Sequence, residues 1–125
     1  MPEQRLVDTT ILVDHLRGRE DARQYLRSIE GARSVSVVSR AELFAGVFDE
    51  EDRRKVGTLL SAFQTHEVTA PIAEMAGVFK RDYQPSYGTG IADALIAATA
   101  EVHDVRLVTL NEKHFPMLDD LIVPY

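Results

Sequence analysis

Four polar residues stand where segments with strand-like patterns give way to segments with helix-like patterns. Asp8 ends a short apolar run, and Glu42 closely follows a β-branched run. Asp93 lies near the start of an alanine-rich stretch, and Asn111 comes just after a second β-branched run. In parallel α/β sheets, ligands bind at the carboxyl ends of the strands, where the following helices begin. We therefore expect these four side chains to meet at one end of one sheet.

Such a gathering of three carboxylates has a chemical consequence. Two unit charges about 4 Å apart repel by roughly 4 kcal/mol at an effective dielectric constant near 20, so protons or a cation must neutralise the cluster. The chain has no cysteine, and oxygen ligands favour a hard cation such as Mg²⁺ or Mn²⁺. A cation of this kind, held by carboxylates and water, suits hydrolysis of a phosphodiester. The residues by themselves predict a metal site without choosing the reaction.

Each of these residues also has an ordinary structural interpretation. Asp8 is a suitable N-cap for a following helix, Glu42 a first-turn acid favoured by the helix dipole, and Asn111 a turn former. Most of the 20 acidic residues must simply solvate the surface. Asp93 differs because it interrupts the apolar stretch 91–98, where an unpaired charge is costly.

The four histidines of the chain add no metal-ligand pattern. They lack the spacing of a ligand set, and we interpret all four as surface or packing residues: His15, His66, His103 and His114.

The apolar patterning predicts the elements that position the candidate residues. Strands are expected at 5–8, 35–39 and 105–109, with a brief extended segment at 68–69 and a further strand at 121–123. Helices are expected from 11 to Gly18, at 20–30, 40–48 and 52–66, from Pro71 onward, and at 91–103, with a loop at 86–90. This alternation predicts an α/β fold in one domain, residues 1–125. Its parallel sheet should have about four to five strands, with helices on both faces.

Composition limits the classes of protein that remain. With 45% hydrophobic residues the chain supports one packed core, and no apolar run reaches the roughly 20 residues of a membrane span. The amino-terminal residues lack the apolar stretch of a signal peptide, so we expect a cytoplasmic location. The net charge of −6 argues modestly against binding nucleic acid, but a nuclease that gathers carboxylates is itself driven toward an acidic balance.

Four motifs together resemble those of the PIN-domain ribonucleases, and more narrowly the VapC-type toxins of bacterial toxin–antitoxin pairs. The resemblance runs from residue 6 to the carboxyl terminus. Its motifs are Leu6-Val7-Asp8-Thr9-Thr10-Ile11-Leu12-Val13-Asp14, Ser39-Arg40-Ala41-Glu42-Leu43, Ala92-Asp93-Ala94-Leu95-Ile96-Ala97-Ala98-Thr99-Ala100, and Leu107-Val108-Thr109-Leu110-Asn111 with His114-Phe115.

The resemblance implies a Mg²⁺-dependent endoribonuclease, with Mn²⁺ as a substitute, that cleaves cellular RNA and inhibits translation or growth. By motif, Asp8 and Asp93 are the principal metal ligands, and Glu42 completes the acidic site directly or through water. Thr10 matches a hydroxyl position that helps to order the cluster, although a simple cap or turn is an equal interpretation. Asn111 departs from the aspartate of many relatives, which places a second metal ion in doubt.

The resemblance also implies partners. These are an RNA substrate, a cognate antitoxin whose carboxyl-terminal segment covers the site, and a second copy of the chain in a homodimer. The basic residues that are candidates for RNA contact, each equally an ordinary surface charge, are Arg17, Arg19, Arg40, Lys80 and Arg81.

Two alternatives stay open. A catalytically weak PIN-like module that binds RNA or protein is favoured only by the asparagine at position 111. A phosphoryl-transfer enzyme of the dehalogenase or receiver-domain kind is disfavoured, because no lysine follows the strand expected at 105–109 until Lys113.

Overall fold

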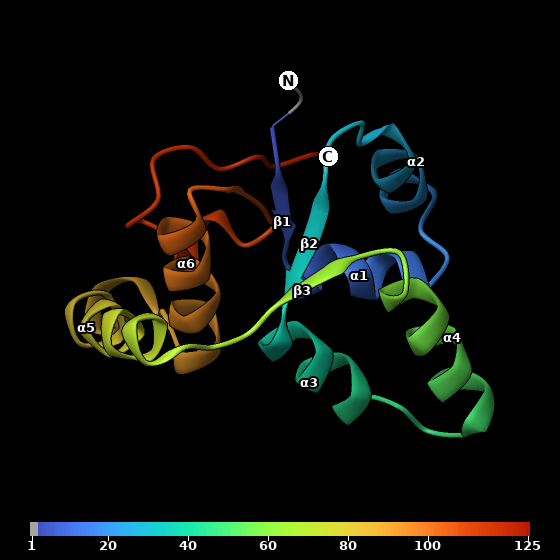
Figure 1. Ribbon diagram of the computed structural model, residues 1–125, viewed down its shortest axis with the longest axis horizontal. Coiled ribbons are helices and arrows are strands. Elements are labelled where there is room, and N and C mark those ends of the chain that lie inside the picture. The colour runs from blue at the N-terminus through green and yellow to red at the C-terminus, as the bar shows by residue number, and fades with distance from the viewer. Residues whose placement is uncertain (1–2) are drawn as a thin grey trace.

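A four-stranded parallel sheet forms the centre of the computed structural model, which describes residues 3–125 (Figure 1). The strands are β1 (Arg5–Val7), β2 (Arg33–Ser36), β3 (Gln64–His66) and β4 (Arg106–Val108), in the order β3-β2-β1-β4. Leu6 pairs with Ser34 on one side and with Leu107 on the other. An isolated parallel bridge joins Val108 to Ile122, where the sequence predicted a last strand. The expected parallel α/β class is therefore confirmed.

Helices cover both faces of this sheet. They are α1 (Thr9–Leu16), α2 (Glu20–Ser28), α3 (Val37–Ala45), α4 (Glu50–Leu60), α5 (Ala70–Tyr87) and α6 (Ile91–His103), with a short 3₁₀ turn, η1 (Glu112–His114). Figure 1 shows α5 and α6 to one side of the strands and α1, α2 and α4 to the other. No helix within residues 3–125 is long and apolar enough to cross a membrane.

The core is divided by the sheet because successive strand side chains point to opposite faces. Leu6 packs in a cluster with Leu107 and with the α6 residue Ile96, whereas the neighbouring Val7 and Val108 belong to a cluster with α1, α2 and α4. The alanines of α6 let it pack closely on α5. The start of α6 consequently lies beside the carboxyl ends of β1 and β4.

The strand expected at 35–39 ends earlier. β2 stops at Ser36, and Val37 begins α3 although Val37 and Val38 are β-branched. Ser36 is the N-cap residue, and its Oγ accepts a hydrogen bond from the backbone N–H of Val38 at 3.0 Å. The cap and the helix that follows it outweigh the strand propensity of the two valines. Glu42 consequently lies in the second turn of α3 instead of the first.

The prediction of a helix at 52–66 is also wrong at its carboxyl-terminal end. α4 ends at Leu60, and residues 64–66 form β3, whereas the extended segment was expected at 68–69. β3 pairs in parallel with β2, with His66 opposite Ser36. Pairing with a strand about 30 residues away in the sequence thus overrides the local helical pattern.

The loop expected at 86–90 begins two residues later than predicted. α5 continues through Pro85 to Tyr87 and ends at Gly88, whose φ of 73° is a left-handed conformation that glycine adopts without strain. The helix expected at 40–48 ends at Ala45, three residues early. The remaining boundaries shift by no more than about two residues, which is ordinary for helix and strand ends.

Candidate active site

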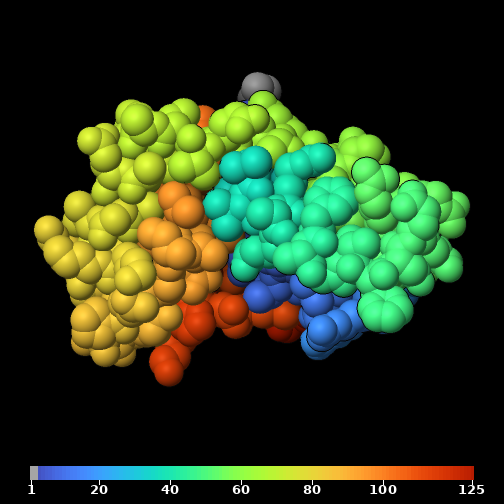
Figure 2. Space-filling view, turned by 90° about the horizontal axis from the view of Figure 1, so that it is seen from below, coloured from blue at the N-terminus to red at the C-terminus, as the bar shows by residue number. Residues whose placement is uncertain are grey.

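All five residues expected at the site line one cavity of about 360 Å³ at the carboxyl ends of β1 and β4. Figure 2 looks onto this side of the molecule, where α1 (blue) and the segment after β4 (red-orange) lie between the α5–α6 pair and the α3–α4 pair. The cavity is lined by Asp8, Thr9, Thr10, Val13, Asp14, Arg17, Glu42, Asp93, Leu110 and Asn111.

Asp8 is the buried acid of the cavity, with 3% of its surface exposed. Its backbone N–H donates to the carbonyl oxygen of Val108 at 2.9 Å, which extends the β1–β4 pairing by one residue. Burial raises the pKa of the Asp8 carboxyl group, hydrogen bonds from Thr109 and Thr10 lower it, and the charge of Asp93 raises it further. Asp8 occupies the N-cap position of α1, but its side chain makes no capping hydrogen bond. Its carboxylate lines the cavity and accepts hydrogen bonds from hydroxyl groups instead.

Two threonine hydroxyls hold this carboxylate in place. Oγ1 of Thr109 donates to Oδ2 of Asp8 at 2.7 Å, and Oγ1 of Thr10 donates to the same oxygen at 3.1 Å. Each hydroxyl also accepts a backbone N–H, Thr10 from Leu110 at 3.2 Å and Thr109 from Asn111 at 2.9 Å. Thr10 is thus one of two hydroxyl groups that contact this acid. Thr109, fully buried, received no role from the sequence; a hydroxyl at the end of an apolar strand was its only signal.

Asp93 lies in the first turn of α6 with 24% of its side chain exposed. Its Oδ2 accepts a hydrogen bond from the backbone N–H of Gly90 at 3.4 Å and lies 3.2 Å from Nδ1 of His114. The Asp93 carboxylate, which interrupts an apolar stretch, therefore has the Gly90 N–H and the His114 ring as partners. His114 was interpreted as a surface or packing residue, so its contact with a candidate ligand corrects that interpretation. Its place in the fourth motif, before the buried Phe115, was the signal available in the sequence.

Glu42 reaches the cavity from α3 and is exposed. Its Oε1 lies 2.7 Å from the hydroxyl of Thr9, and that hydroxyl lies 2.9 Å from Oγ of Ser39. The contact of Glu42 with the Asp8 region therefore passes through the first residue of α1. Asn111 precedes the η1 turn, makes no capping hydrogen bond with its side chain, and is exposed at the cavity.

The carboxylates line one cavity without converging on a single point. No three histidine, aspartate or glutamate side chains in the described part of the chain are grouped closely enough to hold one ion by themselves. Mg²⁺ usually keeps several waters and takes one or two protein carboxylates. Asp8 and Asp93, whose charges interact across the cavity, fit such an ion, and the buried Asp8 carboxylate would gain the compensation that a cation provides.

Asp14 also lines the cavity but is already engaged. It accepts hydrogen bonds from the hydroxyl of Tyr125 at 2.9 Å and from Arg19 at 3.3 Å. Burial raises the pKa of the Tyr125 hydroxyl, and the hydrogen bond to Asp14 raises it further. These contacts fix the carboxyl-terminal residue against α1 and leave Asp14 less suited to bind a cation.

Of the five candidate RNA contacts, Arg17 is the one that lines the cavity. The other four donate hydrogen bonds to residues of the same chain: Arg19 to Asp14 at 3.3 Å, Arg40 to Thr65 at 3.2 Å, Lys80 to Gln84 at 2.8 Å, and Arg81 to Asp82 at 2.9 Å. Arg17 is therefore the strongest of these candidates by position.

The chain is similar to known proteins over nearly its whole length. Residues 5–121 match the family described as PIN domain. The chain is 46% identical to Ribonuclease VapC10 of Mycobacterium tuberculosis, over 96% of this chain and 92% of that protein. It is 42% identical to Ribonuclease VapC19 of the same organism, over 97% and 99% of the two chains. A solved toxin–antitoxin complex from Klebsiella pneumoniae contains a chain with a TM-score of 0.84 and 29% identity, covering 97% of this chain and 98% of that one.

The match covers nearly the whole chain, with two relatives above 40% identity. The protein therefore belongs to the PIN domain family.

Proposed function

We propose that this protein is a metal-dependent endoribonuclease and the toxin of a toxin–antitoxin pair. The observation that carries the proposal is the buried Asp8 carboxylate, which shares a cavity with Asp93 at the carboxyl ends of two parallel strands. Two relatives with more than 40% identity carry the name Ribonuclease VapC. Cleavage of cellular RNA in the cytoplasm would inhibit translation or growth.

Each candidate residue then has a role that its contacts support. Asp8, fixed by Thr109 and Thr10, and Asp93, fixed by His114, would hold the cation. When bound, Mg²⁺ or Mn²⁺ orients the scissile phosphate and lowers the pKa of a coordinated water. Glu42, an exposed residue of the cavity lining, would orient water there. Asn111 contributes an amide without charge, so a single cation is the simpler proposal.

A second, more apolar groove supports the antitoxin partner. It has a volume of about 290 Å³, lies between α1, α3 and α4, and includes Val13, Leu43 and Val47. It shares Arg17 and Glu42 with the acidic cavity, so a protein segment lying in this groove would also cover the site. The solved complex from Klebsiella pneumoniae is described as a toxin–antitoxin complex. The homodimer implied by the sequence resemblance is retained as part of the proposal.

The second candidate function is a catalytically weak module that binds RNA or protein. The neutral Asn111 side chain at the cavity favours it, because the site has one charge fewer than an aspartate would give. Metal binding separates the two functions, since a module without catalytic activity should respond little to Mg²⁺ or Mn²⁺.

The test is incubation of the purified protein with total cellular RNA, followed by mapping of the cut ends. Cleavage should stop in EDTA and return with Mg²⁺ or Mn²⁺ but not with Ca²⁺, whose looser coordination positions the attacking water poorly. The Asp8→Asn variant, prepared in the same way, controls for a contaminating nuclease. Cleavage that continues unchanged in EDTA would indicate a metal-independent ribonuclease and overturn the assignment.

A further inference from the structure

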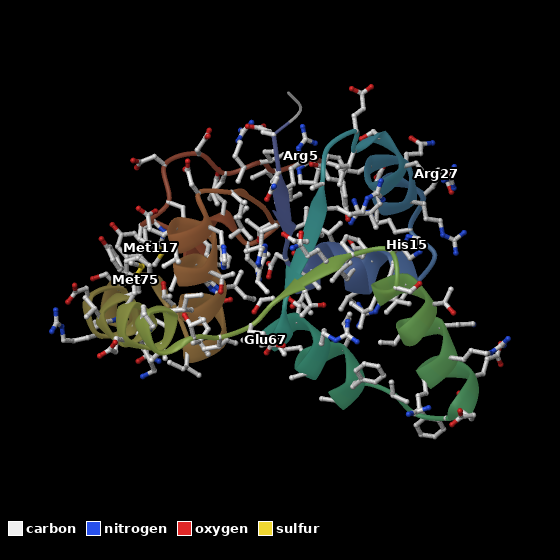
Figure 3. All side chains as sticks on the ribbon, viewed as in Figure 1. Arg5, His15, Arg27, Glu67, Met75 and Met117 are labelled. Carbon is white, nitrogen blue, oxygen red and sulfur yellow. The ribbon has the colours of Figure 1, made fainter. Side chains whose placement is uncertain are left out.

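A basic pocket of about 370 Å³ lies between α1, α2 and α4. Figure 3 places the labelled His15 in the space between α2 and α4. Every ionisable side chain lining this pocket is basic, although the chain as a whole has a net charge of −6. The pocket is lined by His15, Leu16, Arg23, Arg54, Lys55, Thr58 and Leu59.

The two arginines of the pocket differ from their neighbours in having no carboxylate partner. On α2, Arg27 lies 3.9 Å from Glu20, and on α4, Arg53 lies 3.6 Å from Glu50. For Arg23 and Arg54, one turn and one residue away, no carboxylate of residues 3–125 lies within 4.0 Å. Like charges facing one pocket repel, so a bound anion would stabilise this arrangement.

His15 shows the same lack of a partner. Its Nδ1 is buried and has no hydrogen-bond partner among the described residues, which is unusual for a buried polar atom. Burial lowers the pKa of the His15 imidazole, and the positive charges of Arg23 and Arg27 lower it further. Lys55, in contrast, lies 3.5 Å from Glu51, so the charges of the pocket without a carboxylate within 4.0 Å are those of Arg23 and Arg54.

The basic pocket, the apolar groove and the acidic cavity share lining residues in succession. The pocket shares Leu16 and Lys55 with the apolar groove, and that groove shares Val13, Arg17 and Glu42 with the cavity. Of the shared lining residues, Val13 and Leu16 lie on α1 and Arg17 directly follows it, so the path from cavity to pocket runs along this helix. Five residues of an α-helix span about 8 Å. An RNA strand carries a phosphate on every nucleotide, so a strand bound at the cavity presents further phosphates along this path.

Resting on the proposed function, we propose that the pocket formed by His15, Arg23, Arg54 and Lys55 binds a phosphate of the RNA strand away from the scissile bond. Phosphate contacts supply sequence-independent affinity and position the strand. Here they would offset the repulsion between the RNA and the acidic cavity. RNA is favoured over an acidic protein segment because the path begins at the cavity where the phosphodiester would be cut.

The test compares the double variant Arg23→Gln/Arg54→Gln with Arg27→Gln/Arg53→Gln. The second pair removes the same charge from the same two helices, but both arginines are already ion-paired and lie outside the pocket. Binding of a fluorescent single-stranded RNA is measured in EDTA at several salt concentrations. The pocket variant should bind several-fold more weakly, and its salt slope should fall by about 0.7, the contribution of one phosphate contact on a single strand. The control should behave as wild type.

Titration with inorganic phosphate gives an independent reading. The His15 ring resonances should shift in wild type and in the control variant but not in the pocket variant. Because the changed side chains are exposed, thermal unfolding should show all three proteins folded.

RNA affinity and salt slope equal to wild type in the pocket variant would overturn the proposal. So would loss of binding to a co-expressed antitoxin with RNA binding intact, because the pocket would then serve the protein partner. If wild type fails to cleave RNA while phosphate still shifts His15, the proposed function fails and the anion site stands.

Discussion

Nδ1 of His114 lies 3.2 Å from Oδ2 of Asp93, which joins the η1 turn after β4 to the first turn of α6. The ring of His114 also packs over Gly88, where a Cβ atom would lie 3.7 Å from Nε2, and Thr89 donates a hydrogen bond to the His114 carbonyl oxygen at 2.8 Å. His114 is thus held on two sides while it contacts a candidate cation ligand. Partners of this kind orient a ligand and tune its affinity for metal.

Replacing His114 tests this relationship. His114→Ala should weaken Mn²⁺ binding about tenfold, in the range found for residues that orient ligands. His114→Asn should retain more affinity than His114→Gln, because its amide nitrogen occupies a position near Nδ1. Isothermal titration calorimetry with Mn²⁺ measures the three affinities. Equal weakening in the asparagine and glutamine variants would show that the contact with Asp93 is not what matters.

Asp93→Asn should reduce RNA cleavage by about 100-fold or more, the size of effect expected when an electrostatic contributor to the site is lost. The fold should remain intact, because an amide oxygen can still accept the hydrogen bond from Gly90. Without metal the variant should be as stable as wild type or more so, since repulsion with Asp8 is relieved. Cleavage assays and thermal unfolding in EDTA check both parts. Full activity in a folded variant would remove Asp93 from the site.

Asn111→Asp should tighten metal binding and destabilise the metal-free protein. Both effects follow from one cause, a further negative charge at the cavity. Melting curves with and without Mn²⁺ should therefore show a larger metal-induced rise in Tm than wild type. Activity can change in either direction, because a firmly held metal also retains product. A metal response equal to that of wild type would make Asn111 an ordinary turn residue.

Asp8 should make the metal-free protein less stable as the pH rises. Burial raises its pKa above 3.8 in the folded state, so over the pH range between the unfolded and folded values the folded protein binds more protons. The free energy of unfolding then falls with increasing pH through that range. In EDTA, the stability of Asp8→Asn relative to wild type should rise from pH 3.8 upward and level off above the folded pKa.

Denaturant unfolding across a pH series measures this dependence. Asp119→Asn, which changes an exposed acid, is the matched control and should show no comparable trend. A stability difference for Asp8→Asn that is independent of pH would contradict the raised pKa.

The sequence by itself was sufficient for the class of fold and for bringing four polar residues to one end of the sheet. Apolar runs alternating with helical periodicity predict a parallel sheet, and in such sheets the residues after the strands meet at one edge. Asp8 and Asn111 follow β1 and β4 closely, Asp93 lies in the first turn of α6, and all three line the same cavity. These predictions succeed because each depends on a local pattern combined with a general rule of topology.

The partners of those residues were decided only by the tertiary structure. Thr109 reaches Asp8 because β4 pairs with β1 in one register, and His114 reaches Asp93 because the chain turns back after β4. The early end of β2 at Ser36 and the position of β3 likewise depend on a cap and on a pairing between distant segments. Residue types specify which hydrogen bonds can form, but which of them do form depends on contacts between parts of the chain far apart in sequence, and local propensity carries no information about those contacts.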